Sequence, residues 1–169
     1  MTSSLRVHLG LVLERYLRHF HTSRENRACW EIAEAIAHYE EMLRLNPGDN
    51  QGLRYLLLGH YLETGDLAGA RRLFAEYDEG STVFIWGLVL ERYLSGDLAG
   101  AAQALRIARQ QNPDVEPYLT GRKRMRKDRP EYLELGEGSE AEFCMDTIGP
   151  AWARHREAVQ WVKKAVLSL

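Results

Sequence analysis

The hexapeptide Gly65-Asp-Leu-Ala-Gly-Ala70 recurs letter for letter as Gly96-Asp-Leu-Ala-Gly-Ala101, 31 residues further along the chain. In each copy the glycine can end one helix, because it adopts the left-handed conformation without a steric penalty. The aspartate that follows can cap the free N–H groups of the next helix. The repeated segment therefore predicts two helical hairpins that share the same tight turn.

Two further duplications support an internal repeat. The octapeptide Gly10-Leu-Val-Leu-Glu-Arg-Tyr-Leu17 recurs as residues 87–94, and Asn46-Pro47 recurs as Asn112-Pro113. Proline disfavours the helical conformation in the residue before it, so each Asn-Pro pair predicts the end of a second helix. Three coincidences of this kind indicate a repeat architecture rather than chance.

The apolar residues around the first turn follow a helical spacing. Between Asn50 and Glu63 these residues are Leu53, Leu57, Leu58, Tyr61 and Leu62. A spacing of three and four residues places them on one face of a helix. We therefore expect an all-α fold, a solenoid of about three helical hairpins with a C-terminal capping helix. A strand within residues 50–111, or one continuous helix through either turn, would contradict this prediction.

These residues resemble the pattern of tetratricopeptide repeats. The middle hairpin carries the resemblance at Tyr61, Gly65, Ala70 and Phe74, the third at Gly96, Ala101, Leu105, Ala108 and Pro113, and the first at Ala35, Tyr39, Leu43 and Pro47. The first hairpin departs from the pattern, since Trp30 stands where a glycine is expected. The alanines let the two helices of a hairpin approach closely, so a bulkier residue at Ala70 or Ala101 should overpack the contact.

A wider resemblance extends over residues 28–165. The segments Leu45 to Leu58 and Pro117 to Lys123 are similar to a group of bacterial tetratricopeptide-repeat proteins with a shared C-terminal extension. That group has no established activity. The resemblance therefore implies a fold and says little about function.

Residues beyond the repeats predict a linker and a cap. Ser139-Glu-Ala-Glu142 has the spacing of a capping box and predicts a short helix through Met145. Gly149-Pro150 then predicts a break before an amphipathic helix from Pro150 to Leu167, which packs on the open end of the solenoid. The expected division is helical repeats at residues 1–113, a charged linker at 114–138 and a C-terminal helical cap at 139–169.

A basic run in the linker offers a second function. The run consists of Arg122, Lys123, Arg124, Arg126, Lys127 and Arg129. Such residues can contact phosphates, so the alternative function is a nucleic-acid-associated adaptor, whose binding would fall steeply with salt. However, no aromatic residue is interleaved for base stacking, acidic residues follow at once, and the net charge of the chain is only −2. The simpler interpretation is a solvated linker that pairs with the acidic residues.

The resemblance also implies a groove. In that family the first helices of the hairpins line a concave surface, and the residues that correspond here are Tyr16, Tyr55, Leu62, Glu63, Trp86, Leu90 and Tyr93. An aromatic and aliphatic lining suits an amphipathic helix or an extended peptide, so we expect a protein or peptide partner. Two alternatives stay open: the C-terminal tail fills this groove, or the protein forms a homodimer through it. If Trp86 and Tyr93 are both fully buried by their own chain, the partner site lies elsewhere.

The residues that carry chemistry in enzymes do not form a convincing set. His19-Phe-His21 with Cys29 lacks a second pair of metal ligands, so no metal or cofactor is expected. Glu14 and Glu91 occupy equivalent positions of the repeated octapeptide and are explained by duplication rather than by acid–base catalysis. The chain has neither a GxGxxG motif nor a Walker phosphate loop. We therefore expect no enzyme, with a small helical enzyme as the most distant alternative.

Composition limits the setting of the protein. The chain has 169 residues, of which 45% are apolar and 27% charged, as in ordinary globular domains. No apolar run approaches the roughly 18 to 20 residues that span a bilayer, and the N-terminus lacks the charged-then-apolar order of a signal peptide. The two cysteines form no CxxC pair. A cytoplasmic location with reduced thiols is the expectation.

Overall fold

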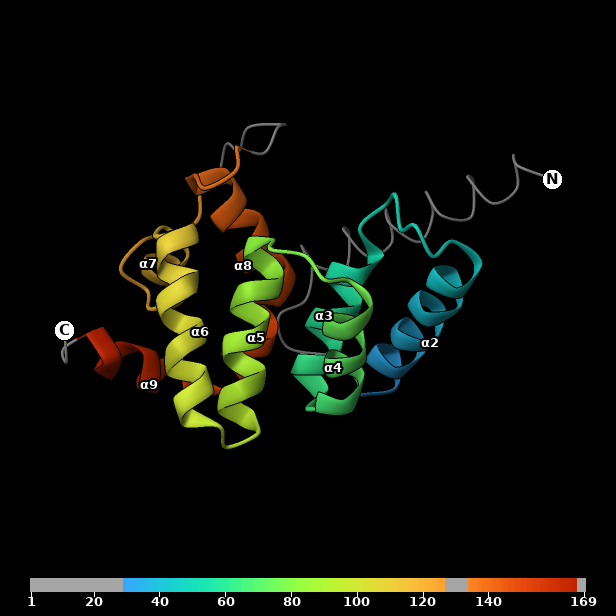
Figure 1. Ribbon diagram of the computed structural model, residues 1–169, viewed down its shortest axis with the longest axis horizontal. Helices are drawn as coiled ribbons and strands as arrows, with labels where there is room; N and C mark the ends of the chain where they lie inside the picture. The colour runs from blue at the N-terminus through green and yellow to red at the C-terminus, as the bar shows by residue number, and fades with distance from the viewer. Residues whose placement is uncertain (1–28, 127–133, 167–169) are drawn as a thin grey trace. The chain divides into compact units, whose positions relative to one another are not determined.

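The computed structural model describes residues 29–126 and 134–166, and over these residues it contains eight helices and no strand. The helices are α2 (Cys29–Leu45), α3 (Leu53–Thr64), α4 (Leu67–Glu76), α5 (Thr82–Leu94), α6 (Leu98–Gln111), α7 (Val115–Leu119), α8 (Gly138–Arg154) and α9 (Arg156–Val166) (Figure 1). The all-α prediction is therefore confirmed. Within the described part of the chain, no helix combines the length and the apolar character needed to cross a membrane.

The chain divides into two compact units, residues 1–35 and residues 36–169. Helix α2 crosses the boundary between them, and every contact described below lies within the second unit. Two complete hairpins are described, α3 with α4 and α5 with α6. The first helix of the predicted first hairpin lies outside the described residues.

The two predicted turns have the same geometry. Gly65 and Gly96 both adopt the left-handed conformation, with φ of 77° and 81°. The carboxylate of Asp66 accepts a hydrogen bond from the backbone N–H three residues later at 2.9 Å, and the carboxylate of Asp97 does the same at 2.9 Å. Neither turn is crossed by a continuous helix. The repeat deduced from the duplicated hexapeptide is thus confirmed in its local structure.

The alanines of the hexapeptides lie in the helix contacts. Ala70 and Ala101 are both fully buried, in the second helices of their hairpins. A methyl side chain at these positions lets the neighbouring helix approach closely, and any additional carbon atom would have to displace packed atoms. Their burial agrees with the packing role expected from the sequence.

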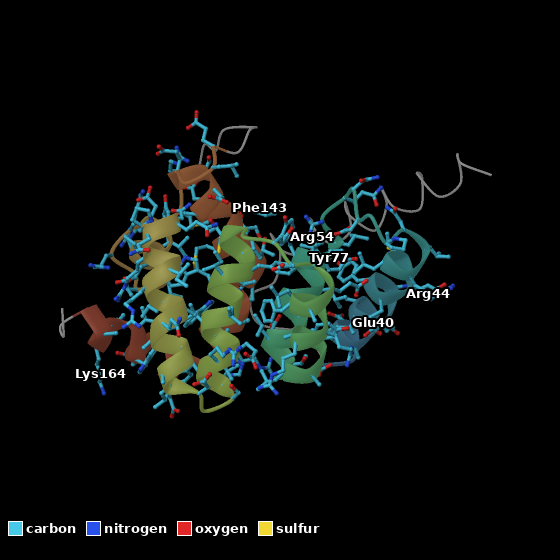
Figure 2. The ribbon with its side chains drawn as sticks, in the orientation of Figure 1. Glu40, Arg44, Arg54, Tyr77, Phe143 and Lys164 are labelled. Atoms are coloured by element: carbon cyan, nitrogen blue, oxygen red, sulfur yellow. The ribbon has the colours of Figure 1, made fainter. Side chains whose placement is uncertain are left out.

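Arg54 connects the start of α3 to the loop after α4. Its guanidinium donates to the carboxylate of Asp49 at 2.8 Å and to that of Glu79 at 3.0 Å, and it lies 5.5 Å from the centre of the Tyr77 ring (Figure 2). Asp49 also accepts a hydrogen bond from the backbone N–H of Leu53 at 2.8 Å. One carboxylate therefore caps α3, while its arginine partner holds the loop between α4 and α5.

Helix α8 runs without interruption through Gly149 and Pro150, so the predicted break at this pair is wrong. Proline removes one helical hydrogen bond, and its ring crowds the residue before it. Here the residue before it is glycine, whose missing Cβ relieves that crowding. The buried residues Ile148 and Trp152 lie on both sides of the proline, so packing of a continuous apolar face offsets the lost hydrogen bond.

The predicted capping box at the start of α8 is also wrong. The helix begins at Gly138, one residue earlier than expected, and its N-cap residue makes no side-chain hydrogen bond to the first turn. The Ser139 hydroxyl accepts from the backbone N–H of Glu134 at 2.9 Å, outside the helix. Glu142 is buried and bonded to Tyr118 and Arg126, because a buried carboxylate is stabilised more by an arginine than by a helix N-terminus.

Candidate protein-interaction site

The first helices of the two described hairpins, α3 and α5, lie side by side, and one further helix packs against both of them. Helix α8 packs along both of them, and Figure 1 shows it running behind α5. At Gly59 of α3, an added Cβ would lie 2.5 Å from the backbone oxygen of Thr147 in α8. The lack of a side chain at Gly59 therefore lets the backbones of α3 and α8 come together.

Helix α8 presents one apolar strip to this face. The strip consists of Ala141, Cys144, Ile148, Ala151 and Trp152, all of which are buried. Their spacing of three and four residues places them on one side of the helix. The ring of Trp152 meets that of Trp86 edge-on, with the ring centres 6.2 Å apart. Beyond the last turn of α8, His155 Nε2 lies 3.0 Å from the backbone oxygen of Leu62.

Six of the seven residues predicted to line the groove fall into three groups. Leu62, Trp86 and Leu90 are fully buried, whereas Tyr55 and Tyr93 keep part of their rings exposed. Tyr16 lies outside the described residues. Trp86 thus packs within its own chain, but Tyr93 does not meet the same condition, and the partner-binding role of the whole set stays a prediction.

The two half-exposed tyrosines each pair with an aromatic residue of the C-terminal helices. Tyr55 stands perpendicular to Phe143 of α8, with ring centres 6.0 Å apart. Tyr93 lies against Trp161 of α9, with ring centres 5.4 Å apart. Phe143 is labelled in Figure 2 and, like Trp161, is itself half-buried. The surface left at the edges of the face is therefore aromatic and is shared between the repeats and the tail.

Glu63, the remaining residue of the predicted set, lies beside His60 on α3. Its carboxylate lies 3.7 Å from Nδ1 of His60, and the His60 ring stacks on Tyr39 of α2 with ring centres 5.8 Å apart. All three side chains are buried. The stacked pair joins α2 to α3.

Two polar atoms on α5 are buried without a hydrogen-bond partner among the described residues. They are the hydroxyl oxygen of Thr82 and the indole nitrogen of Trp86. Both residues touch α8, since the Cys144 thiol lies 3.8 Å from the backbone oxygen of Thr82 and Trp86 meets Trp152. A buried polar group without a partner destabilises a fold by about 1–3 kcal/mol. The contact between α5 and α8 is thus apolar in fit and incomplete in hydrogen bonding.

The basic run is paired with carboxylates where the structure describes it, and two of the three carboxylates are buried. Arg122 binds Glu116 at 2.9 Å, Lys123 binds Asp114 at 3.0 Å and Arg126 binds Glu142 at 3.0 Å. Arg124 is exposed, and Lys127 and Arg129 lie outside the described residues. The pairing expected from the sequence includes Glu142, whereas Glu116 and Asp114 precede the run. These ion pairs connect the segment after α7 to both α7 and α8.

Glu142 is the most enclosed of these carboxylates, with 1% of its surface exposed. It accepts hydrogen bonds from the Tyr118 hydroxyl at 3.0 Å and from the backbone N–H and the guanidinium of Arg126, both at 3.0 Å. Burial acts to raise the pKa of Glu142, but the bonds from Arg126 and Tyr118 outweigh it and lower the pKa below 4.5. The ionised form is therefore the one that the fold stabilises.

Replacement of Glu142 by glutamine should give a pH-dependent loss of stability. A lowered folded-state pKa contributes stability above the unfolded value, and this contribution disappears as the pH falls below about 4.5. At pH 7 we expect Glu142→Gln to lower the free energy of unfolding by about 1–2 kcal/mol, since Arg126 is partly exposed and screened. Urea unfolding from pH 7 to about pH 3.5 measures the difference in the free energy of unfolding between Glu142→Gln and the wild type. The control is Glu157→Gln, at an exposed position of α9. A difference that does not become smaller in acid would contradict this role of Glu142.

The predicted packing helix from Pro150 to Leu167 includes Trp152, but the sequence did not indicate the earlier α8 residues that cover α3 and α5. Their strip becomes visible only if the pattern is followed through Gly149 and Pro150, where the local rules predict a break. Thr147 and Gly59 meet through the backbone, which no side-chain pattern records. The contact of His155 with Leu62 likewise joins residues far apart in the chain.

Comparison with known proteins identifies one segment of the chain. Residues 31–80 match the family model of the tetratricopeptide repeat. No curated protein and no solved structure matches the chain. The matched segment contains most of α2 and all of α3 and α4. Tetratricopeptide repeats generally mediate protein–protein interactions and are typically not enzymes. The chain thus carries a tetratricopeptide repeat at residues 31–80 within an all-α helical-repeat fold.

Proposed function

We propose that the protein is a protein-binding module whose partner docks on the face formed by α3 and α5. The observation that supports this most directly is that the face accommodates a helix, since α8 lies along both of its helices. The alternating aromatic and aliphatic residues of such a face suit a partner helix or an extended peptide. The role is one of binding, without catalysis, in the cytoplasm.

The edges of the face supply contacts that a partner can reach directly. Tyr55 with Phe143, and Tyr93 with Trp161, are half-exposed aromatic pairs on either side of the covered centre. Aromatic residues at the centre of an interface often lose on the order of 2 kcal/mol of binding energy when truncated to alanine. We further propose that residues 139–169 act as one cap that completes this surface. In the chain this cap follows the repeats at residues 1–113 and the linker at residues 114–138.

The ion pairs of the basic run argue against the nucleic-acid alternative. A phosphate that took Arg126 would leave Glu142 buried without its cation, and one that took Arg122 would leave Glu116 with Arg109 alone. An unpaired buried charge is strongly destabilising, so these arginines have a structural use that competes with phosphate binding. We therefore place the protein partner first.

Photo-crosslinking in extracts of the source cells tests the proposed face. The full chain carries p-benzoylphenylalanine in place of Tyr55 in one preparation and of Tyr93 in a second. The matched control carries it in place of Ile107, an exposed residue of α6. We expect one protein to be crosslinked from positions 55 and 93 and not from position 107, since only the first two lie at the edges of the face.

The salt dependence of capture separates the two candidate functions. An apolar protein contact keeps its yield between about 0.1 and 0.5 M salt, whereas a phosphate-dependent contact weakens by orders of magnitude. Equal adducts at position 107, adducts lost with salt or nuclease, or no adduct at positions 55 and 93 would each contradict the proposed function.

A further inference from the structure

We propose that α8 is an exchangeable occupant of the α3–α5 face. The partner segment is then an amphipathic helix that carries the apolar strip of α8 and adds hydrogen-bond acceptors opposite Thr82 and Trp86. This inference rests on the proposed function and specifies the chemistry of the partner and its mode of entry.

The first support is that the face is shaped for a helix with a particular strip. At Gly59 the backbone of the occupant passes so close that a single methyl group would meet it at 2.5 Å. On the neighbouring helix α5, the fully buried Trp86 receives the edge of Trp152. A helix that fits here therefore presents bare backbone or a small residue at the Gly59 crossing and an aromatic residue about one turn later.

The second support is that α8 leaves part of this face unsatisfied. The Thr82 hydroxyl and the Trp86 indole N–H are buried beside α8, and neither has a hydrogen-bond partner among the described residues. The strip that α8 offers them consists of alanine, cysteine, isoleucine and tryptophan side chains, none of which is a good acceptor. A helix with a carboxamide, carboxylate or hydroxyl oxygen at this place would keep the apolar fit and satisfy both donors.

The third support is a weak point within α8 itself. Pro150 lies inside the helix and cannot donate the N–H bond that the preceding turn would accept. The turns before the proline are held by Asn112, whose amide donates to Glu140 at 3.1 Å, and by the bonds from Arg126 to Glu142. Helices bend most readily at such a proline. Exchange therefore begins at the second half of α8, and the turns before the proline leave the face after it.

A labelled peptide with the sequence of residues 138–155 probes exchange on the full-length protein. Fluorescence polarisation measures its apparent Kd, which is the intrinsic Kd divided by the fraction of chains with an open face. Trp152→Ala in the chain loosens its own α8, so we expect the peptide to bind at least about tenfold more tightly than to the wild type. Trp152→Phe, which keeps more of the packing, should lie between the two.

Two further chains change the face and tether the occupant. Thr82→Val removes an unpaired buried hydroxyl that the resident α8 and the peptide both cover, so it should stabilise both bound states alike and leave the apparent Kd within about twofold of the wild type. A chain with Cys29→Ser, Tyr55→Cys and Phe143→Cys, closed by a short bismaleimide, holds α8 on α3 and should bind no peptide. Cys144 does not interfere, because it is fully buried and burial raises the pKa of its thiol well above its usual value.

The matched control is Trp161→Ala, which removes an indole from α9 without uncovering Trp86; its apparent Kd should stay within about twofold of the wild type. Equal binding by the closed and open chains, or no gain for a Trp152→Ala or Trp152→Phe chain that circular dichroism shows to be folded, would overturn exchange. If crosslinking from position 93 persists in the closed chain, where position 55 carries the bismaleimide, the partner docks on the edges instead. The proposed function then stands and the exchange does not.

Discussion

Replacement of Trp152 by alanine should lower the free energy of unfolding by about 3–5 kcal/mol, more than any other single truncation in the tail. Trp152 is 1% exposed and packs its ring on Trp86, which is completely buried. Truncation removes apolar area from the interior and leaves a cavity that the two flanking helices cannot close without losing their other contacts. Urea unfolding followed by circular dichroism measures the change.

The other tail tryptophan provides the comparison. Trp161 is half-buried and meets Tyr93 at the edge of the face, so Trp161→Ala should lower the free energy of unfolding by only about 1 kcal/mol. A double-mutant cycle with Trp86→Ala should return a coupling of about 0.5–1.5 kcal/mol for the Trp86–Trp152 pair, beyond simple burial. Equal losses for the two tail tryptophans would show that α8 does not anchor on α5 through Trp152.

The parts of the fold that could be predicted from the sequence depend on short-range chemistry. Each Gly-Asp turn is made by residues within a few positions of one another, with the glycine supplying the left-handed conformation and the aspartate the cap. The duplicated hexapeptide therefore carried the turn geometry with it. The burial of Ala70 and Ala101 followed from the same repeat.

The errors arose where distant residues outweigh a local rule. Gly149-Pro150 predicts a break, but α8 gains more from an uninterrupted buried strip than it loses at one hydrogen bond. The spacing of Ser139 and Glu142 predicts a capping box, but Glu142 is taken by Arg126, 16 residues earlier. Both outcomes depend on tertiary contacts that the local spacing does not contain.

The candidate site could be predicted only in outline. The sequence indicated which sides of α3 and α5 are apolar, and the structure shows that Leu62 and Trp86 are buried on these helices. Whether a face of this kind is covered by its own chain depends on how α8, which begins 44 residues after the end of α5, folds back. It depends on the close backbone contact at Gly59 and on the fit between the helix surfaces, and neither can be read from the spacing of residues in the sequence.

Replacement of Gly59 by valine tests that approach directly. The first carbon of any side chain here would lie 2.5 Å from the backbone oxygen of Thr147, and a backbone atom cannot rotate out of the way. Helix α8 must then shift away from α3. We expect a loss of about 2–3 kcal/mol in the free energy of unfolding, which exceeds the small gain in helix propensity.

The matched substitution is Gly80→Val, since no atom lies within 4 Å of the Cβ that it would add. Its effect should stay within about 0.5 kcal/mol. Cys144 provides a second measurement, because it is a fully buried member of the strip and burial raises the pKa of its thiol. A displaced α8 exposes this thiol, so Gly59→Val should react with a disulfide reagent under native conditions faster than the wild type, and Gly80→Val should not. If Gly59→Val leaves both stability and Cys144 reactivity unchanged, α8 does not cross α3 at Gly59, and neither the covered face nor the exchange inferred from it would survive.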